Sequence, residues 1–359
     1  MDGSKAASER PSNLRIHAAL VFTQIIFGAG SVVGSLGLPA FNPLLFALIR
    51  EGCAGPILLA ISMLTTSARP WHLGPADRKG VGVLGLTIFG NQLFFIVGLK
   101  LSNPVAGSIW QPSQPIITAA LAIALGWERA RARRLAGIAI AFAGCATMVG
   151  LSASAVESSS MQNEVIGNAC FFINCFATSC YVLRSKPMLR QWPSICITAW
   201  AYMCASFYML AVGFVLNSWP AALKFLCSDC TNGGWHVPPE ALPALAYWII
   251  FQSVLAYQLM TWANKFVSAS LVSAYSVLQP VTSASLTATI LLCNAYRNCA
   301  DQDDDVRHCL SMPGYADLGS LGVFVGLYFV VTSEAPHDEA VALTAAVNPL
   351  LADSEEADA

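Results

Sequence analysis

Long stretches free of Asp, Glu, Lys and Arg alternate with short polar segments along most of the chain. A charge at the centre of a bilayer costs about 3 kcal/mol or more, so charge-free apolar runs of about 20 residues are typical of membrane-spanning helices. The pattern predicts an all-α, polytopic membrane protein with ten transmembrane helices. The expected spans are 15–36, 42–64, 80–101, 104–126, 134–151, 164–184, 194–216, 242–264, 268–293 and 316–333.

Composition supports this interpretation. Of the 359 residues, 55% are hydrophobic and 11% are charged, whereas soluble domains are about 25% charged. These values exclude a soluble enzyme, a disordered chain and a small disulfide scaffold. The net charge of −2 gives no basic surplus for binding nucleic acid. The polar segment 1–14 leads into an apolar run without a signal-peptide cleavage pattern, so the first helix is expected to be retained.

The basic residues predict the orientation. With a cytosolic N-terminus, most Lys and Arg residues fall on the cytosolic side, as the positive-inside rule requires. The exceptions are Arg50 within a span and Lys100, Lys224, Arg297 and Arg307 on the opposite side. An even number of spans returns the acidic tail 334–359 to the cytosol, where we expect it to be disordered. The plasma membrane and a vacuolar or other endomembrane both fit this pattern.

Four cysteines lie in the two longest non-cytosolic loops. Disulfides persist on the oxidising side of a membrane, so we expect Cys299–Cys309 and Cys227–Cys230 pairs. Free or zinc-binding thiols are the alternative. A zinc site needs a tighter ligand layout, and we therefore expect no metal and no cofactor.

The two halves of the chain resemble each other. Gln114-Pro115 and Gln279-Pro280 are 165 positions apart, and at the same offset Lys100 matches Lys265 and Thr118 matches Ser283. We expect two five-helix halves, 15–151 and 164–333, joined by an outside linker at 152–163, with an insertion at about 294–314. Because five is odd, the second half would be inverted relative to the first, which is a common transporter design.

Polar side chains within the spans are candidates for lining a central cavity, since they must avoid lipid. Gln111, Gln114 and Thr118 are spaced by three and four, which places them on one helical face. Interhelical hydrogen bonding is the alternative role. The full set of substrate-binding candidates is Gln24, Arg50, Gln92, Gln111, Gln114, Thr118, Tyr257, Ser276 and Gln279.

Arg50 and Glu51 are charged residues inside the second predicted span. Arg50 could attract a substrate carboxylate and Glu51 could carry a coupling proton; a position near the surface, or pairing with other helices, is the alternative. Carbonyl groups freed by Pro115 and Pro280 could bind a substrate ammonium, or the prolines could only kink their helices. The GxxxG motifs at Gly30–Gly34 and Gly322–Gly326 favour close helix packing and are compatible with a homodimer.

An ordered set of residues resembles a known family. The set comprises Gln24 to Gly30 (QIIFGAG), Asn42-Pro43, Arg50, Gly90-Asn91-Gln92, Gly98-Leu99-Lys100, Gln111, Pro115, Thr118, Glu128, Trp262, Lys265, Leu278 to Val281 (LQPV), Gly319, Gly322 and Gly326-Leu327-Tyr328. In this respect the chain is similar to the EamA-type branch of the drug/metabolite transporter superfamily, and most similar to the plant walls-are-thin-related (nodulin-like, UMAMIT) group. Cys293 replaces a frequent Glu of that group, and its usual Trp-Gly-Lys is absent at Val331 to Glu334.

The resemblance implies a ten-helix carrier of amino acids, auxin or related small metabolites. We therefore expect a secondary transporter of small organic metabolites, most simply amino acids or auxin-like acids, that works by alternating access. A carrier of purines or nucleotide sugars and a polytopic membrane enzyme are the alternatives. The chain has five His and neither an HExxH pair nor a Walker A motif, so we expect neither an enzyme nor an ATP-driven pump. The expected partners are the solute, a proton and the lipid bilayer.

Overall fold

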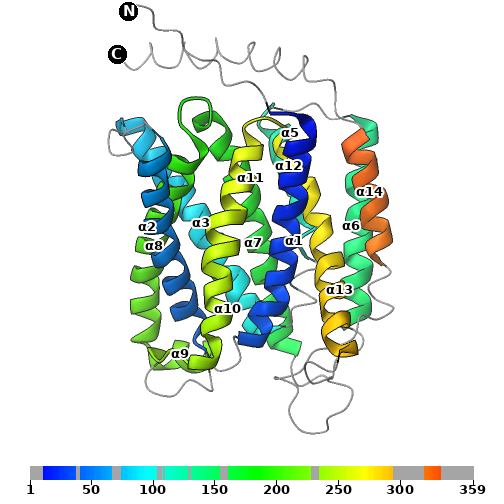
Figure 1. Cartoon of the computed structure of the whole chain (residues 1–359). Helices are drawn as coiled ribbons and strands as arrows, with labels where there is room; N and C mark the ends of the chain where they lie inside the picture. Colours follow the sequence, from blue (N-terminus) through cyan, green and yellow to red (C-terminus); the bar gives the residue numbers. More distant parts are fainter. Residues whose placement is uncertain are drawn as a thin grey trace, which may run out of the picture.

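The computed structural model describes residues 11–37, 41–66, 74–102, 107, 110–127, 131–153, 161–227, 234–293 and 319–332. All regular structure within these residues is helical, and the long helices stand side by side in one bundle (Figure 1). The helices are α1 (Asn13–Gly37), α2 (Pro43–Thr65), α3 (Pro75–Leu101), α5 (Ser113–Ala124), α6 (Ala132–Ala153), α7 (Met161–Met188), α8 (Ser194–Asn217), α9 (Pro220–Leu226), α10 (Leu242–Tyr247), α11 (Tyr257–Asn264), α12 (Ala269–Ala274), α13 (Leu278–Leu292) and α14 (Ser320–Thr332). A π-helical segment, Trp248–Ala256, joins α10 to α11, and a 3-10 turn, Tyr275–Val277, joins α12 to α13.

Six helical stretches in the described part are long and apolar enough to cross a membrane: Asn13–Gly34, Pro43–Thr65, Asp77–Leu101, Val165–Met188, Ser194–Asn217 and Pro239–Asn264. Each overlaps one predicted span, and α5, α6, α12–α13 and α14 occupy the other four predicted ranges. Large apolar side chains such as Phe207, Phe214 and Val215 of α8 lie on the outer surface. A water-soluble bundle would place polar groups there, so this surface is suited to lipid. The chain is a polytopic, all-helical membrane protein.

Short polar signals set where several helices begin. Asn42 caps α2, and its Oδ1 accepts a hydrogen bond of 3.0 Å from the N–H of Leu44, while Pro43 takes the first helical position. Ser268 caps α12 in the same way through Leu271, at 3.2 Å. Both caps satisfy N–H groups that have no partner within the helix.

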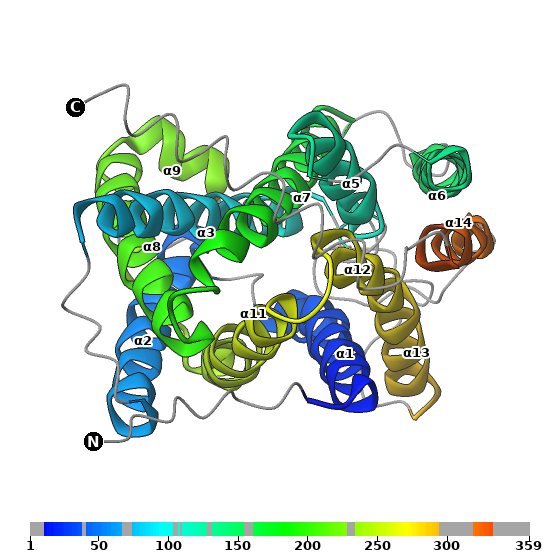
Figure 2. The ribbon, with the colours of Figure 1, turned by 90° about the horizontal axis from the view of Figure 1, so that it is seen from above.

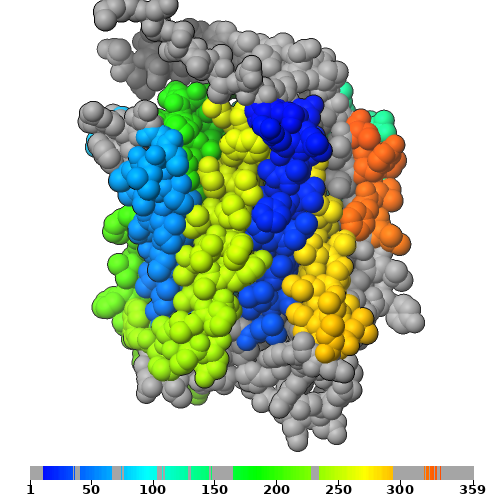
Figure 3. Space-filling model, in the orientation of Figure 1, coloured from blue at the N-terminus to red at the C-terminus, as the bar shows by residue number. Residues whose placement is uncertain are grey.

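The helix pairs follow a regular scheme (Figure 2). α3 packs against α7 and α8, while α1 packs against α13, α10, the π-helical segment and α11. α2 packs against α8, α5 against α7 and α12, and α6 against α14. Figure 3 shows α2, α10–α11, α1, α13 and α14 side by side on one face of the molecule. Segments far apart in the chain thus build the interior together.

Both GxxxG motifs pack within the chain. A Cβ atom at Gly326 would lie 2.5 Å from the carbonyl oxygen of Gly137, and one at Gly322 would lie 3.2 Å from Cα of Gly144. These contacts join α14 to α6 at the edge of the bundle (Figure 2). On α1, Gly34 faces the indole of Trp248, with a Cβ distance of 2.5 Å. The small residues therefore let helices approach closely inside one chain.

The outer loops are described only in part. Cys227 is disulfide-bonded, but Cys230, Cys299 and Cys309 lie outside the described residues, so the predicted pairings stay predictions. The predicted insertion at 294–314 and the tail 334–359 also lie outside them. α7 begins at Met161, inside the range predicted as a linker.

We expect Gly326→Val to destabilise the protein, because its side chain would collide with the backbone of α6. Overpacking of this kind costs about 1–3 kcal/mol. Thermal unfolding in detergent, followed by the loss of the monodisperse peak, measures the effect. Gly52→Val is the matched control, since nothing lies within 4 Å of a Cβ atom there. Equal melting temperatures for the two variants would contradict the close α6–α14 contact.

Candidate functional site

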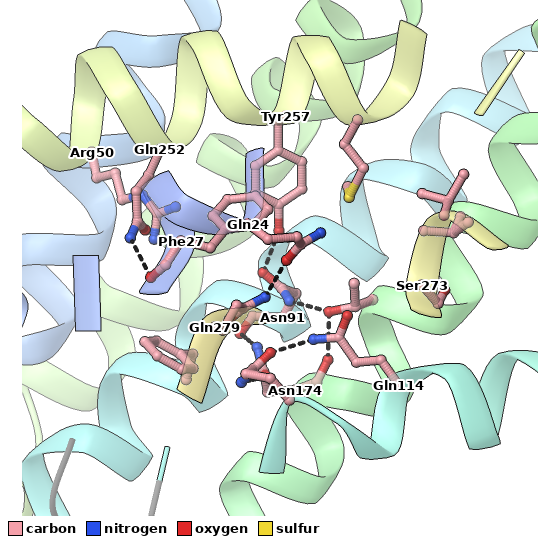
Figure 4. A pocket seen from close by; sticks show the side chains of 16 residues that line it. Gln24, Phe27, Arg50, Asn91, Gln114, Asn174, Gln252, Tyr257, Ser273 and Gln279 are labelled. Atoms are coloured by element: carbon pink, nitrogen blue, oxygen red, sulfur yellow. Dashed lines mark hydrogen bonds between the residues drawn. The ribbon is translucent and has the colours of Figure 1, made fainter. Parts of the chain in front are cut away.

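A small cavity lies within the bundle, between α1, α2, α3, α7, α13 and the segments around them (Figure 4). The space open to the centre of a water molecule is about 50 Å³. One water needs about 10–15 Å³ on this measure, so the cavity holds only a few waters. Its lining residues are Gln24, Phe27, Arg50, Asn91, Phe95, Gln111, Gln114, Asn174, Thr178, Val182, Gln252, Tyr257, Met260, Val272, Ser273 and Gln279.

Arg50 is the charged residue of this lining. Its Nε donates a hydrogen bond of 2.7 Å to Oγ of Ser253, and its guanidinium carbon lies 4.6 Å from the centre of the Trp248 ring. A desolvated guanidinium gains about 2 kcal/mol from such a ring face. The indole N–H of Trp248 donates to the carbonyl oxygen of Gly30 at 3.0 Å, which fixes the ring. Arg50 is thus oriented by two residues of the π-helical segment.

The π-helical segment also places Gln252 beside Arg50 (Figure 4). π-helical turns are rare and are frequent at functional sites. The Gln252 amide fits because Gly30 has no side chain: a Cβ atom there would lie 1.3 Å from Nε2 of Gln252. The same Nε2 donates to the carbonyl oxygen of Phe27 at 3.4 Å. A glycine of α1 therefore makes room for a polar group in the cavity wall.

Asn91 is the centre of the hydrogen-bond network in the cavity wall. Its Nδ2 donates to Oγ1 of Thr178, and its Oδ1 accepts from the hydroxyl of Tyr257 at 2.6 Å. Nδ2 of Asn174 donates to the Asn91 carbonyl oxygen at 2.8 Å, and Gln111 donates in turn to Oδ1 of Asn174 at 3.2 Å. Asn91 thereby connects α3, α7 and α11 around the cavity.

The remaining amides pair with one another. Nε2 of Gln279 donates to Oε1 of Gln24 at 2.6 Å, which joins α13 to α1. Nε2 of Gln114 donates to Oε1 of Gln111. In this closed arrangement the side chains satisfy each other, and a solute that enters has to replace these bonds with its own. Amides suit this exchange, because each carries both donors and acceptors.

Six of the nine predicted site residues line the cavity: Gln24, Arg50, Gln111, Gln114, Tyr257 and Gln279. The other three lie behind the wall, which corrects their expected position. Gln92 donates to the hydroxyl of Tyr202 at 2.8 Å, Thr118 bonds to Ser273 Oγ at 2.8 Å, and Ser276 donates to the carbonyl oxygen of Gln111 at 2.9 Å. Of these three, Ser276 lies in the 3-10 turn that precedes α13, whereas Gln92 and Thr118 lie within α3 and α5.

The carbonyl group freed by Pro115 is also occupied. Proline has no N–H, so the carbonyl oxygen of Gln111 loses its α-helical donor. Gln114 N–H and the Ser276 hydroxyl supply replacements, at 3.0 and 2.9 Å. This carbonyl oxygen therefore joins two helices and is not open to a substrate ammonium.

The other lining residues were not predicted from the sequence: Asn91, Asn174, Thr178, Gln252 and Ser273 among the polar ones, and Phe27, Phe95, Val182, Met260 and Val272 among the apolar ones. The spacing of four between Asn174 and Thr178 is a helical stripe and could have revealed them. Gln252 follows the π-helical geometry, which the apolar pattern does not indicate.

Glu51 lies next to Arg50 but not in the cavity lining. Its side chain is fully buried, and neither carboxyl oxygen has a hydrogen-bond partner among the described residues. A buried carboxyl group without a partner is costly. No group of three or more His, Cys, Asp or Glu residues in the described part could hold a metal ion.

One family model matches most of the chain. The model of the EamA-like transporter family matches residues 15–150 and 165–293. The chain is 23% identical over 280 residues to the uncharacterized transporter YyaM of Bacillus subtilis, covering 77% of this chain and 87% of that protein. It is 24% identical to an uncharacterized transporter of Archaeoglobus fulgidus, over 76% and 88% of the two chains.

A plant protein and a solved structure extend the comparison. The chain is 21% identical over 342 residues to a WAT1-related protein of Arabidopsis thaliana, covering 87% of this chain and 83% of that protein. A solved crystal structure matches with a TM-score of 0.59 and 17% identity, over 89% of this chain and 98% of the other. The latter likeness concerns the fold.

We expect Asn91→Ala to lower the melting temperature in detergent, because it leaves the Tyr257 hydroxyl without its partner and removes one of the two hydrogen bonds of the Thr178 hydroxyl. Each buried polar group left unsatisfied costs about 1–3 kcal/mol. Thr289→Ala is the control, since its exposed hydroxyl bonds only to Ser285 of its own helix. An unchanged melting temperature for Asn91→Ala would show that the network is not rigid.

Proposed function

The chain belongs to the EamA-like transporter family, and we propose that it is a secondary carrier that moves a small organic solute through the central cavity by alternating access. The family and its relatives make it a transporter and not an enzyme. One observation carries the proposal: a cavity in the interior with polar and apolar walls and a single oriented cation in its described lining. Polar residues at this depth in a membrane protein mark substrate pathways.

The lining favours a solute with a carboxylate. Arg50 supplies a guanidinium, which binds carboxylates through two parallel hydrogen bonds. Gln252 lies beside it, and the amides around Asn91 and Gln279 offer donors and acceptors to the rest of the solute. Phe27 and Phe95 provide apolar surface. We therefore propose amino acids or auxin-like acids as the substrate class, ahead of purines and nucleotide sugars.

We also propose ten spans arranged as two inverted five-helix repeats. The packing scheme supports this, because the pairs correspond when the halves are exchanged: α3–α7 corresponds to α11–α1, and α5–α7 corresponds to α13–α1. The hydrogen bond between Gln111 and Ser276 joins two equivalent positions. Equivalent positions touch only near an axis that relates the halves, so the cavity would lie at this axis, as in other inverted-repeat carriers.

Hydrogen bonds join the two halves near both ends of the bundle. Asn42 at the start of α2 donates to Asn217 at the end of α8, at 2.6 Å. His17 near the start of α1 bonds to Tyr275 at 2.6 Å. The starts of α1 and α2 lie at opposite ends of the bundle (Figure 1). Contacts between the halves at both ends are the kind that alternating access would break and form in turn.

We expect Arg50→Gln to reduce uptake or efflux of the transported solute at least about tenfold and Gln279→Ala about two- to tenfold, because each removes a hydrogen bond to it. A charged hydrogen bond contributes about 1.5–3 kcal/mol and a neutral one about 0.5–1.5 kcal/mol. The assay uses labelled amino acids, indole-3-acetate and purines in cells that express the protein. Gln258→Ala is the matched control, since Gln258 bonds to Ser194 outside the cavity lining.

The amount of each variant at the assayed membrane is measured in parallel. Full activity in Arg50→Gln and Gln279→Ala would remove these residues from the site. No transport of any panel member by the wild type would reject the proposed substrate classes.

Ten spans place both termini on the same side of the membrane. Epitope tags at the N- and C-termini should therefore both be accessible only from the cytosol, in intact and selectively permeabilised cells. Accessibility of one tag from the opposite side would mean an odd number of crossings and would contradict the paired five-helix halves.

A further inference from the structure

Glu51 is the buried acid that the carrier mechanism above leaves unused. It is fully buried in α2, and both of its oxygens lack a hydrogen-bond partner in the described part of the chain. An ionised carboxylate in such a place needs a compensating charge. Arg50 is the adjacent residue and acts on Glu51 electrostatically.

The two side chains do not form a hydrogen-bonded pair. Successive residues of a helix point about 100° apart, and Arg50 uses its Nε for Ser253 and its flat face for Trp248. The rest of the guanidinium has no protein acceptor among the described residues and belongs to the cavity lining. The positive charge of Arg50 can therefore compensate either the carboxylate of Glu51 or an anion bound in the cavity.

The other titratable groups near Glu51 are neutral phenols. Tyr202 of α8 and Tyr257 of α11 both interact with it electrostatically. Tyr202 is bonded by Gln92 of α3 and by Ser253, and Tyr257 by Asn91. The π-helical segment contributes Trp248 and Ser253, which carry no charge. Among these groups, Arg50 is the one whose charge favours the ionised form of Glu51, against the effect of burial.

We propose that a substrate anion and a proton bind together, the anion at Arg50 and the proton at Glu51, so that transport is an electroneutral cotransport of one anion with one proton. This inference rests on the proposed function. With the anion bound, the guanidinium is neutralised and an ionised Glu51 would be left uncompensated in a region of low dielectric constant. With the cavity empty, Arg50 and ionised Glu51 compensate each other, so the carrier returns without net charge.

The linkage has a definite direction. A proton on Glu51 frees the charge of Arg50 for the anion, and the anion favours the proton by the same factor. Anion affinity therefore rises as the pH falls on the side from which both enter. A gradient of protons then drives accumulation of the anion on the opposite side.

The first experiment needs no substrate. Neutralising Arg50 imitates anion binding, so Arg50→Gln at neutral pH should show a stronger infrared band of a protonated carboxyl group than Arg50→Lys, which keeps the charge. The band should vanish when Glu51→Gln is added to Arg50→Gln. Equal bands in the two Arg50 variants, or a band that survives Glu51→Gln, would overturn the proposal.

The second experiment uses Glu51→Gln in proteoliposomes with labelled indole-3-acetate, with protein-free vesicles as the background. Exchange of labelled for unlabelled solute needs no net proton movement and should be retained, whereas accumulation driven by a pH gradient should be lost. Gradient-driven accumulation by Glu51→Gln would contradict the proposed coupling. Exchange by the wild type with no gradient-driven accumulation would contradict it as well, and in both cases the carrier function stands. If the wild type does not exchange this probe, auxin-like acids are removed from the proposed substrates and the infrared comparison decides the coupling.

Discussion

The interior of this protein depends on the requirement that polar groups in a membrane be satisfied within the protein. The hydrocarbon region contains no water that could replace a missing hydrogen-bond partner. A buried amide or hydroxyl therefore needs a partner within the protein. Asn91 shows the result: its side chain and carbonyl oxygen together join α3 to α7 and α11. The same requirement pairs polar side chains elsewhere in the bundle, such as Asn42 with Asn217 and Asn264 with Ser185.

Close helix approach makes this pairing possible. Gly30 and Gly34 of α1 leave room for Gln252 and Trp248, and these residues surround Arg50. The indole ring and the Ser253 hydroxyl hold the guanidinium at the cavity without using its whole hydrogen-bonding capacity. The glycines of α1 thus help to determine where the guanidinium of Arg50 on α2 lies. This dependence is visible only in the assembled bundle.

Much of the helix layout follows from the sequence, because a charge-free apolar run has few alternatives to a membrane helix. The polar stripes were enough to find Gln24, Gln111, Gln114 and Gln279 in the cavity lining. They failed for Thr118, whose hydroxyl bonds to Ser273 of α12, and for Ser276, which lies in the 3-10 turn before α13. They missed Gln252, which reaches the wall from a π-helical segment. Periodicity describes the regular part of a helix, and two polar residues of this wall, Gln111 and Gln252, come from segments that are not α-helical.

The hydrogen bonds of the cavity wall determine what a solute must break to enter. A solute that enters the cavity has to break bonds such as Gln279–Gln24 and Gln111–Asn174, and it returns hydrogen bonds of the same kind. The net cost of exchanging one neutral bond for another is about 1 kcal/mol or less, whereas removing an unreplaced partner costs more. A solute with matching donors and acceptors therefore opens this network at small cost, and one without them leaves amides unpaired. In such a wall, selectivity comes from the penalty on the wrong solute as much as from attraction to the right one.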